Sequence, residues 1–164
     1  MGKVVMHNVV SVDGFIADEH DGVGPLFDWY GNGDHELDGG AKVSQASYDY
    51  LRPAYDALKV TIVGRHVFDL TNGWDGRPPM VDHMVVVSHL PKPEGWHPDA
   101  PYHFVDNVED AAGLVDEVSM DVVPVVFGSG KRYFGSVDSQ HLLEDPDVVV
   151  EGDRVLHLRY RVRR

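Results

Sequence analysis

The chain contains no cysteine. This absence excludes a disulfide framework and any chemistry that uses a thiolate. Long apolar runs are missing as well, because no stretch approaches the ~18 consecutive apolar residues of a membrane-spanning helix. The first residues follow the pattern of a polar-flanked strand rather than that of a signal peptide. We therefore expect a cytoplasmic protein that has no membrane partner.

Positive charge is scarce, with 14 lysines and arginines against 27 aspartates and glutamates and a formal net charge of −13 at pH 7. Such an acidic surface repels phosphate backbones, so we expect no nucleic-acid partner. The last eleven residues are the exception, because they contain five arginines and no acid: Arg154, Arg159, Arg161, Arg163 and Arg164. We interpret these arginines as alternating charges on the solvent face of an edge strand, where they block pairing with another sheet.

The signatures of three common kinds of active site are also missing. The ten histidines include no pair with the helical spacing of the His-Glu-x-x-His motif, so we predict no metal centre. There is no Gly-x-Ser-x-Gly elbow, which argues against a Ser-His-Asp hydrolase. The glycine-rich stretch at 128–132 lacks the glycine spacing of a P-loop and the Ser or Thr after its lysine. A tight turn is therefore the better interpretation of that stretch.

The sequence does contain short apolar segments that are separated by turn residues. Helical spacing predicts an amphipathic helix over 44–58, broken or kinked at Pro53. Apolar runs predict strands over 3–12, 59–63, 84–88, 102–105 and 114–127, and a hairpin of 148–150 with 155–162. The first strand is apolar enough to be central. This order predicts a single α/β domain over 1–164, with a mostly parallel central sheet and an antiparallel C-terminal hairpin.

One interval is too short for this plan. Between the strands predicted over 102–105 and 114–127 there are too few residues for a parallel crossover, which needs a dozen or more. Two explanations stay open. Either these strands are antiparallel neighbours, or a segment is missing near 111–113.

Polar residues follow the predicted first strand. Ser11, Asp13 and Gly14 stand at its carboxyl end, where open α/β sheets bind their ligands, and Asp13 is the best-placed ionisable group. A tight turn at Asp13-Gly14 with a local cap at Ser11 is an equally good interpretation. An aromatic cluster comes next in the chain: Phe27, Trp29 and Tyr30. It is either part of the core or a wall for a flat heterocycle.

Two further strand ends carry polar residues. Gly64-Arg65-His66 follows a predicted strand and opens a helical turn, so its amides and Arg65 could hold an anionic group. Ser88-His89 ends the next predicted strand in the same way. Ordinary loop chemistry explains either pair taken alone.

Four segments, in this order, resemble the dihydrofolate-reductase-like superfamily, in the branch similar to the C-terminal reductase domain of riboflavin biosynthesis. They are SVDGFIA at 11–17, VGRHVF at 63–68, VVVSH at 85–89 and GLVDEVSMDVVPVVFGSGKRYF at 113–134. The last is the most specific, because an acidic pair leads into a long strand with a proline, a glycine-rich turn and an aromatic residue. The resemblance covers almost the whole chain.

The resemblance implies a dihydrofolate-reductase-like three-layer sandwich and an oxidoreductase that uses NADPH, with NADH as a possible substitute. Hydride would pass to a C=N or C=O bond of a small heterocycle of the pteridine or pyrimidine kind, with protonation through water or Asp13. The resemblance also implies a homodimer. Metal plays no part in this chemistry.

The resemblance assigns roles to the strand-end residues. Asp13 would be catalytic, and Ser11 and Trp29 would bind the substrate. The cofactor-binding residues would be Gly64, Arg65, His66, Ser88 and His89. His89 stands where family members often have arginine, and it is a weaker, pH-dependent cation, so the choice between NADPH and NADH stays open.

One departure from the family pattern falls at the short interval described above. Family members carry there a further strand, a glycine-rich turn that wraps the cofactor pyrophosphate, and a helix. The absence of this strand, turn and helix from the sequence motivates an alternative hypothesis. In it, the chain is a non-catalytic or cofactor-poor homodimer of the same fold that binds a small molecule.

Overall fold

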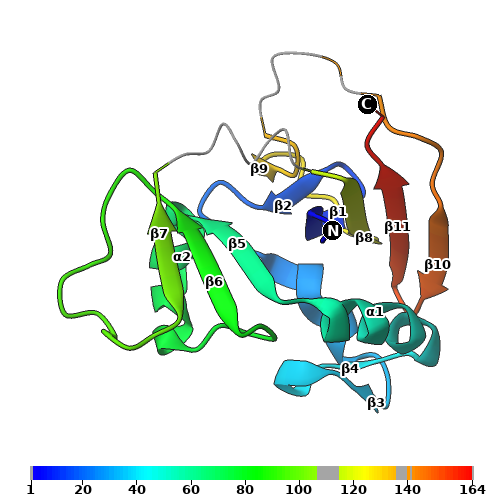
Figure 1. Ribbon diagram of the computed structural model, residues 1–164. Helices are drawn as coiled ribbons and strands as arrows, with labels where there is room; N and C mark the ends of the chain where they lie inside the picture. The colour runs from blue at the N-terminus through cyan, green and yellow to red at the C-terminus, as the bar shows by residue number, and fades with distance from the viewer. Residues whose placement is uncertain (1, 107–114, 136–139, 141, 164) are drawn as a thin grey trace. The chain divides into compact units, whose positions relative to one another are not determined.

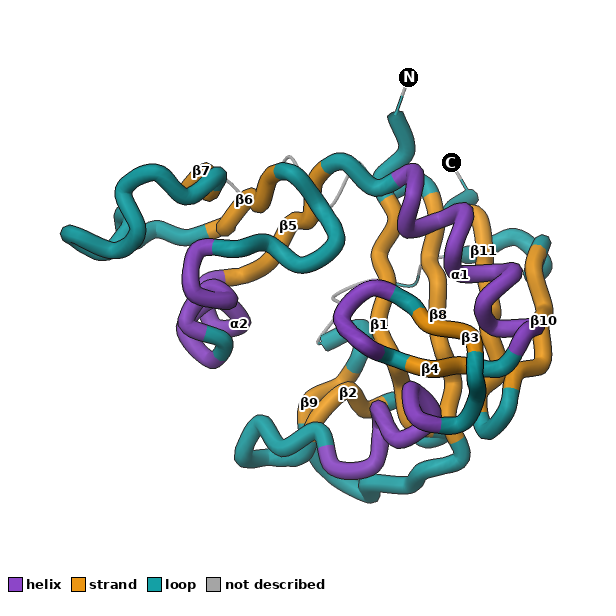
Figure 2. The backbone as a smooth tube through the Cα atoms, turned by 90° about the horizontal axis from the view of Figure 1, so that it is seen from below, coloured by secondary structure: helices purple, strands orange, loops and turns teal. Residues whose placement is uncertain are grey.

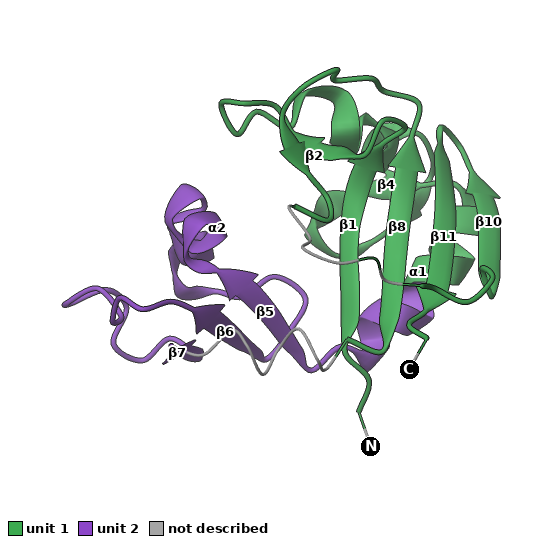
Figure 3. Ribbon diagram, turned by 90° about the horizontal axis from the view of Figure 1, so that it is seen from above, with its two compact units in different colours: residues 1–51, 114–164 green, residues 52–113 purple. Residues whose placement is uncertain are grey.

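The computed structural model describes residues 2–106, 115–135, 140 and 142–163. The chain forms two compact units, which are coloured separately in Figure 3. Unit 1 comprises Met1–Leu51 and Leu114–Arg164, and unit 2 comprises Arg52–Gly113. We describe each unit by itself, and the single domain expected over 1–164 stays a prediction. The segment expected to be missing near 111–113 lies outside the described residues.

Unit 1 is built on a four-stranded sheet in the order β1-β8-β11-β10 (Figure 1). Its strands are β1 (Val5–Ser11), β8 (Glu117–Val123), β11 (Val155–Arg161) and β10 (Val148–Gly152). β1 and β8 are parallel, whereas β11 is antiparallel to both β8 and β10. The predicted C-terminal hairpin is therefore confirmed, and it pairs with a parallel strand pair.

Two strands of this sheet differ from the prediction. β1 lies at one end of the strand order rather than in the middle, and only its last three residues are buried. β8 ends at Val123 and not at 127, because Pro124 has no N–H to continue the ladder. The amide of Val125 instead donates to the carbonyl of Val123 at 2.8 Å, which turns the chain out of the sheet.

Shorter elements of unit 1 surround this sheet. β2 (Phe15–Ala17) pairs with β9 (Lys131–Arg132), and β3 (His35–Glu36) pairs with β4 (Lys42–Val43). Two 3₁₀ helices, η1 (Gly24–Gly31) and η2 (Asp38–Gly40), lie between them in the chain. The predicted helix is confirmed as α1 (Gln45–Ala57), and its first half belongs to unit 1. The helix continues through Pro53, so the break predicted there is wrong.

A chain of buried polar side chains connects α1 to the sheet. Asp121 on β8 is fully buried, and its two carboxylate oxygens lie 2.6 Å from Nδ1 of His157 and 2.9 Å from Nε2 of His7. His157 on β11 is also fully buried, and its Nε2 lies 2.9 Å from the hydroxyl of Ser47 on α1. An ionised carboxylate only accepts hydrogen bonds, so both imidazoles donate to Asp121.

Two opposing effects set the charge state of Asp121. Burial raises the pKa of this carboxyl group, but the hydrogen bonds and charges of His157 and His7 outweigh burial and hold the pKa at about 2. Asp121 is therefore ionised at neutral pH although it is fully buried. Its charge is compensated on both sides, which is the condition for keeping a carboxylate inside a protein.

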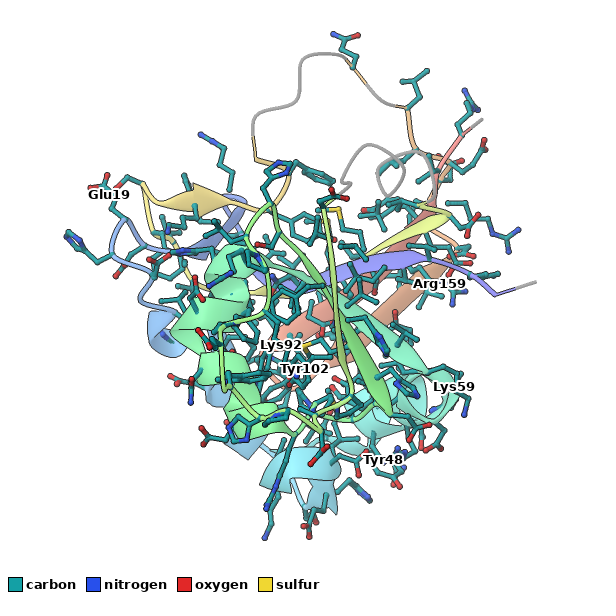
Figure 4. The ribbon with its side chains drawn as sticks, turned by 60° about the vertical axis from the view of Figure 1, so that its left-hand side comes forward. Glu19, Tyr48, Lys59, Lys92, Tyr102 and Arg159 are labelled. Atoms are coloured by element: carbon teal, nitrogen blue, oxygen red, sulfur yellow. The ribbon has the colours of Figure 1, made fainter. Side chains whose placement is uncertain are left out.

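Unit 2 contains a parallel sheet in the order β5-β6-β7, with α2 packed against β5 and β6 (Figure 2). Its elements are β5 (Val60–Gly64), α2 (Arg65–Leu70), η3 (Asn72–Gly76), β6 (His83–Val87) and β7 (Tyr102–Val105). Their core consists of Phe68, Met84, Val86 and Tyr102. The hydroxyl of Tyr102, which is labelled in Figure 4, donates to the carbonyl of Gly73 at 2.7 Å.

The two strands that flank the short interval belong to different sheets. β7 pairs with β6 in unit 2, and β8 pairs with β1 and β11 in unit 1. The expectation that these strands could be antiparallel neighbours is therefore wrong for the described strands. The minimum length of a crossover connection holds only for parallel strands of the same sheet. The short interval by itself therefore could not decide between the two explanations.

The buried carboxylate makes stability depend on pH. The pKa of Asp121 lies below its ordinary value of 3.8, so its stabilisation is present above that value and is lost as the pH falls through about 2. This stabilisation amounts to about 2 kcal/mol. We predict that Asp121→Asn lowers the free energy of unfolding by about 3 kcal/mol at neutral pH and flattens its acid dependence. Urea unfolding followed by circular dichroism over a pH series measures both effects.

The exposed Asp147 provides a matched control. The hydrogen bond from Arg159 lowers the pKa of Asp147 as well, but this pair lies at the surface, where Arg159 is labelled in Figure 4. We expect Asp147→Asn to cost less than about 1 kcal/mol. An acid dependence of Asp121→Asn that equals that of the wild type would contradict the assignment of Asp121.

Candidate functional site

Asp13 joins the end of β1 to the segment that follows β8. Its Oδ1 accepts the hydroxyl of Ser11 at 2.6 Å and the amide of Phe127 at 3.3 Å. Its Oδ2 accepts the amide of Gly128 at 2.7 Å. The hydroxyl oxygen of Ser11 also accepts the amide of Phe15 at 2.9 Å. Both carboxylate oxygens of Asp13 are thus engaged in holding two chain segments together.

The tight turn predicted at Asp13-Gly14 is confirmed. The amide of Gly14 donates to the carbonyl of Ser11 at 2.9 Å, and Gly14 has a φ of +89°. Residues with a side chain rarely adopt this conformation, so the glycine is required by the turn. The turn directs the side chain of Asp13 toward the segment after β8. The tight turn and a candidate site at Asp13 are therefore compatible, and neither interpretation excludes the other.

The charge state of Asp13 follows from its donors. The hydrogen bond from Ser11 is the largest effect and lowers the pKa of Asp13; desolvation, the second-largest effect, raises it, and the amides of Gly128 and Phe127 lower it again. The carboxylate is therefore ionised at neutral pH and accepts hydrogen bonds. Of the two proton sources expected from the sequence, this state favours water over Asp13.

Trp29 lies on η1 and is 2% exposed. Its ring centroid lies 4.4 Å from that of Tyr30 and 5.4 Å from that of His157. It also lines a cavity of about 30 Å³, together with Pro25, Asp28, Val123, Pro124, Val125 and Arg154. Of the aromatic cluster, Trp29 thus belongs to the core and also lines a cavity. The binding of a flat heterocycle by the cluster stays a prediction.

The strand ends bring the unit 1 candidates to one edge of the sheet. Ser11 lies opposite Val123 in the β1–β8 register, and the amide of Val12 donates to the carbonyl of Val125 at 3.0 Å. Ser11 is only 1% exposed, so its hydroxyl positions Asp13 in the structure described. Its role in binding substrate stays a prediction.

Two charged residues of this cavity, Asp28 and Arg154, are not among the site residues predicted from the sequence. Asp28 stands beside Trp29 in the chain, so the aromatic prediction could have included it. Arg154 was assigned to a charged edge strand, but it lies in the β10–β11 turn with a φ of 58°. No local pattern connects that turn to residue 29, because only the folded sheet places them together.

In unit 2 the predicted cofactor-binding residues lie at one edge of the sheet. Gly64 at the end of β5 pairs in parallel register with Val87 at the end of β6. Gly64-Arg65 and Ser88-His89 therefore leave the sheet side by side. A Cβ built on Gly64 meets nothing within 4 Å, so there is open space beside this strand end.

The side chains at this edge differ in how they are engaged. Arg65 donates through Nε to both carboxylate oxygens of Asp69, at 2.8 and 3.0 Å, and through a terminal nitrogen to the carbonyl of Pro91 at 3.2 Å. Ser88 exchanges hydrogen bonds with the backbone of Leu90. His66 and His89 are exposed. Arg65 thus stabilises the loops of this edge, and the two imidazoles stand at its surface.

The chain Ser47–His157–Asp121 has the hydrogen-bond order of a hydrolase triad. All three residues are fully buried, so no substrate can reach the hydroxyl of Ser47. The chain is therefore a structural link, as described above. Among the described residues, no group of three or more His, Cys, Asp or Glu side chains is placed to hold a metal ion. Within the described part of the chain, no helix is long and apolar enough to cross a membrane.

No family model matches this chain, and no curated protein sequence matches it. Solved structures do resemble it. A candidate riboflavin biosynthesis protein from Shewanella sp. PV-4 matches over the full length of both chains, with a TM-score of 0.68 and 18% identity. Dihydrofolate reductase from Enterococcus faecalis, solved with NADP(H), matches over 99% of this chain and 97% of its own, with a TM-score of 0.50 and 14% identity.

A third similar structure is the diaminohydroxyphosphoribosylaminopyrimidine deaminase/5-amino-6-(5-phosphoribosylamino)uracil reductase from Thermotoga maritima. It matches 98% of this chain with a TM-score of 0.58 and 11% identity, and this chain spans 56% of its length. These neighbours are of the two kinds that the sequence motifs predicted. At such identities they establish the fold, so the chain has the dihydrofolate-reductase-like α/β fold.

The bonds of Asp13 lead to a testable expectation. Asp13→Asn places an amide group against the backbone amide of Gly128 or Phe127, so one of these N–H groups loses its acceptor. We predict that hydrogen exchange at Phe127 and Gly128 accelerates by about tenfold or more. Amide exchange followed by NMR measures this change.

Asp18 supplies the matched control for this experiment. Its Oδ1 accepts the amides of His20 and Gly22 in a separate turn. Asparagine keeps this oxygen as an acceptor, so Asp18→Asn should leave exchange unchanged both in that turn and at Phe127 and Gly128. Unchanged exchange at Gly128 in Asp13→Asn would show that Asp13 does not hold the segment after β8.

Proposed function

We propose that this chain is a cytoplasmic NAD(P)H-dependent reductase. In this proposal, hydride is transferred to a C=N or C=O bond of a small heterocycle of the pteridine or pyrimidine kind. The fold supports the proposal, because dihydrofolate reductase and the reductase of riboflavin biosynthesis share it. The alternative is a non-catalytic homodimer of the same fold that binds a small molecule.

One observation carries the proposal: the paired carboxyl ends of β5 and β6 in unit 2. Open parallel sheets bind nucleotides at such ends. The residues present fit the phosphate groups of a dinucleotide, because the open space beside Gly64 admits a close backbone approach. The exposed imidazole of His89 adds a hydrogen-bond donor at this edge.

The residues of unit 1 would serve the substrate. When bound, the nicotinamide cofactor supplies the hydride. Asp13, ionised and held by Ser11, fixes the segment after β8 and sets a negative potential at the strand end. Such a potential favours positive charge that develops on the substrate as water delivers the proton. Trp29 forms one wall of the cavity.

The cofactor proposal predicts a measurable preference. We expect the wild-type chain to bind NADPH and NADH, with quenching of tryptophan fluorescence as the readout. His89→Arg should tighten NADPH binding by about tenfold relative to NADH, because a permanent, forked cation binds the 2′-phosphate better than imidazole does. The change should be absent for NADH, which has no such phosphate.

Two outcomes would contradict this prediction in different ways. Equal effects of His89→Arg on both cofactors would place His89 away from the 2′-phosphate. Absence of binding for either cofactor at millimolar concentration would overturn the reductase and leave the non-catalytic alternative. Lys59→Arg is the matched control, since it also places a guanidinium in unit 2 and should not change the preference.

We also propose that two copies of the chain form a homodimer through one face of the unit 1 sheet. Buried polar residues occupy the face beneath α1, and the opposite face carries apolar side chains in register, with Leu158 opposite Met120 and Val149. The partly exposed or exposed apolar residues of this face include Met120, Val122, Val149, Leu156, Leu158 and Tyr160. Glu151, which lies opposite Leu156, is a charged residue on the same face. A surface with little charge is where two copies of a chain with net charge −13 repel each other least.

The dimer proposal is tested by mass in solution. Light scattering coupled to size exclusion should give twice the chain mass of 18.2 kDa for the wild type. Leu158→Glu should give the monomer, because it places a charge at the centre of the apolar face. Leu70→Glu, which changes an exposed apolar residue of α2 in unit 2, is the control and should remain dimeric. A monomeric wild type would overturn the proposal.

A further inference from the structure

Two histidines of unit 2 stand on neighbouring strands of its sheet. His83 begins β6 and His103 is the second residue of β7, and these strands lie side by side in parallel (Figure 1). His103 lies opposite Val85, which is two residues after His83. Side chains two residues apart along a strand share a face, so His83 and His103 lie on the same face of the sheet. Strand pairing thus brings together two imidazoles that are 20 residues apart in the sequence.

Both imidazoles lie on the face of the sheet that is opposite to the core of unit 2. Met84 and Tyr102 lie next to the histidines along the two strands, and both are buried in that core with Phe68. Because successive side chains of a strand point to opposite faces, the histidines point away from the core. Both residues are exposed. A dissolved ion can therefore reach the imidazoles without a change in the fold.

The facing nitrogens of the pair have the separation of two ligands of one metal ion. Nδ1 of His83 lies 3.4 Å from Nε2 of His103. This distance exceeds the roughly 2.7–3.2 Å of an ordinary hydrogen bond from an N–H group. Two nitrogens that bind one tetrahedral Zn²⁺ at about 2.0–2.1 Å are about 3.3–3.4 Å apart. The nitrogens therefore match an edge of a zinc tetrahedron better than they match a hydrogen bond.

The arrangement of the rings agrees with this separation. The ring planes are tilted by 38° and the ring centroids lie 5.5 Å apart. The imidazoles are therefore not stacked face to face. They meet through one nitrogen of each ring, which is the part of an imidazole that binds a metal ion.

We propose that His83 and His103 bind a divalent transition-metal ion, Zn²⁺ above all, between the amino ends of β6 and β7. His83 binds it through Nδ1 and His103 through Nε2, both as neutral imidazoles. The described residues contain no group of three or more His, Cys, Asp or Glu side chains that could hold a metal ion, so water completes the coordination. The ion is consequently exchangeable, and it links two strands of unit 2.

Other ligand classes fit the imidazole pair less well. Ca²⁺ and Mg²⁺ require oxygen ligands, whereas Zn²⁺, Cu²⁺ and Ni²⁺ favour imidazole nitrogen. An anion would need both imidazoles to be protonated, and two positive charges at this separation repel each other. A chain with a net charge of −13 also attracts cations rather than anions.

This site is separate from the strand ends that the reductase proposal uses. β6 runs from His83 to Val87, and the candidate cofactor residues Ser88 and His89 follow it. The length of β6 is about 13 Å, since a strand rises about 3.3 Å per residue. Histidines on two different strands have no fixed spacing in the sequence, which is why no motif predicted the pair. The inference goes beyond the reductase proposal and does not depend on it.

Titration of the metal-free full chain with Zn²⁺ tests the proposal. Calorimetry after treatment with EDTA and dialysis should show saturable binding of Zn²⁺ and none of Mg²⁺ at the same concentrations. His83→Gln and His103→Gln should each weaken Zn²⁺ binding by about tenfold or more, because the remaining imidazole loses a second ligand held close to it. Unchanged affinity in either variant would overturn the proposal.

A third histidine supplies the matched control. His20→Gln also removes an exposed imidazole, but from unit 1, and it should bind Zn²⁺ as the wild type does. The variant that lacks both His83 and His103 should lose less than the sum of the two single losses, because either substitution alone already removes the paired ligands. Additive losses would show that the two histidines bind metal separately, which would overturn the proposal.

Imidazole nitrogen spectra measure the geometry of the site. Long-range ¹H–¹⁵N NMR distinguishes a metal ion on Nδ1 from one on Nε2. With Zn²⁺ present, the spectra should show the metal on Nδ1 of His83 and on Nε2 of His103, the two nitrogens that face each other. Binding through the other nitrogen of either ring would contradict the assigned geometry.

Thermal unfolding gives a readout that an exposed hydrogen bond alone would not produce. Zn²⁺ should raise the midpoint of the wild type by about a few degrees, because the ion binds only where β6 and β7 are paired, and EDTA should reverse the rise. His103→Gln should unfold like the metal-free wild type, since the side chain is exposed, and should not respond to Zn²⁺. An equal rise in the wild type and in this variant would overturn the proposal.

Discussion

The parallel pairing of β1 with β8 is the constraint on which the unit 1 site depends. Ser11 lies opposite Val123 in this register, so both strands end at the same level of the sheet. Asp13 can then reach the backbone amides that follow β8, although its side chain is short. A register shift by one residue would move every β8 side chain to the opposite face and separate Asp13 from those amides.

Polar side chains in unit 1 fall into two groups, those that form hydrogen bonds with one another and those that have no partner among the described residues. Inside the sheet, Asp121 and His157 satisfy each other, so an ionised carboxylate persists where no water reaches it. At the strand ends, Asp28 and Arg154 face one cavity without a protein partner among the described residues. The first arrangement stabilises the fold, because its donors and acceptors are matched internally. The second leaves a carboxylate and a guanidinium exposed beside the cavity.

Unit 2 has a simpler organisation. A parallel sheet with one short helix presents two adjacent strand ends, and the polar residues of both ends were visible in the sequence. The structure adds the contacts and exposure of these residues. Arg65 donates a hydrogen bond to Asp69, and the side chains of His66 and His89 are exposed.

The sequence predicted those parts of the site whose cause is local. Asp13-Gly14 is a turn because glycine tolerates the required φ, and strand ends carry polar residues because the chain leaves the sheet there. Alternation of apolar and polar residues likewise predicted the C-terminal hairpin. The length of β8 was overestimated, because its apolar pattern continues past Pro124 although the ladder cannot.

Tertiary structure alone decided which distant residues meet. Arg154 and Trp29 line one cavity because β11 lies beside β8. No pattern of residue spacing in the sequence predicts that these two residues lie close together. Burial of Ser11 is also a result of the tertiary fold. The amides of Phe127 and Gly128, more than a hundred residues away, add to the larger local effect of Ser11 on the pKa of Asp13. The sequence by itself thus determined the elements and their polar ends, since these depend on local backbone preference and periodicity. The fold determined the cavity and its charges, since these depend on which strands pair.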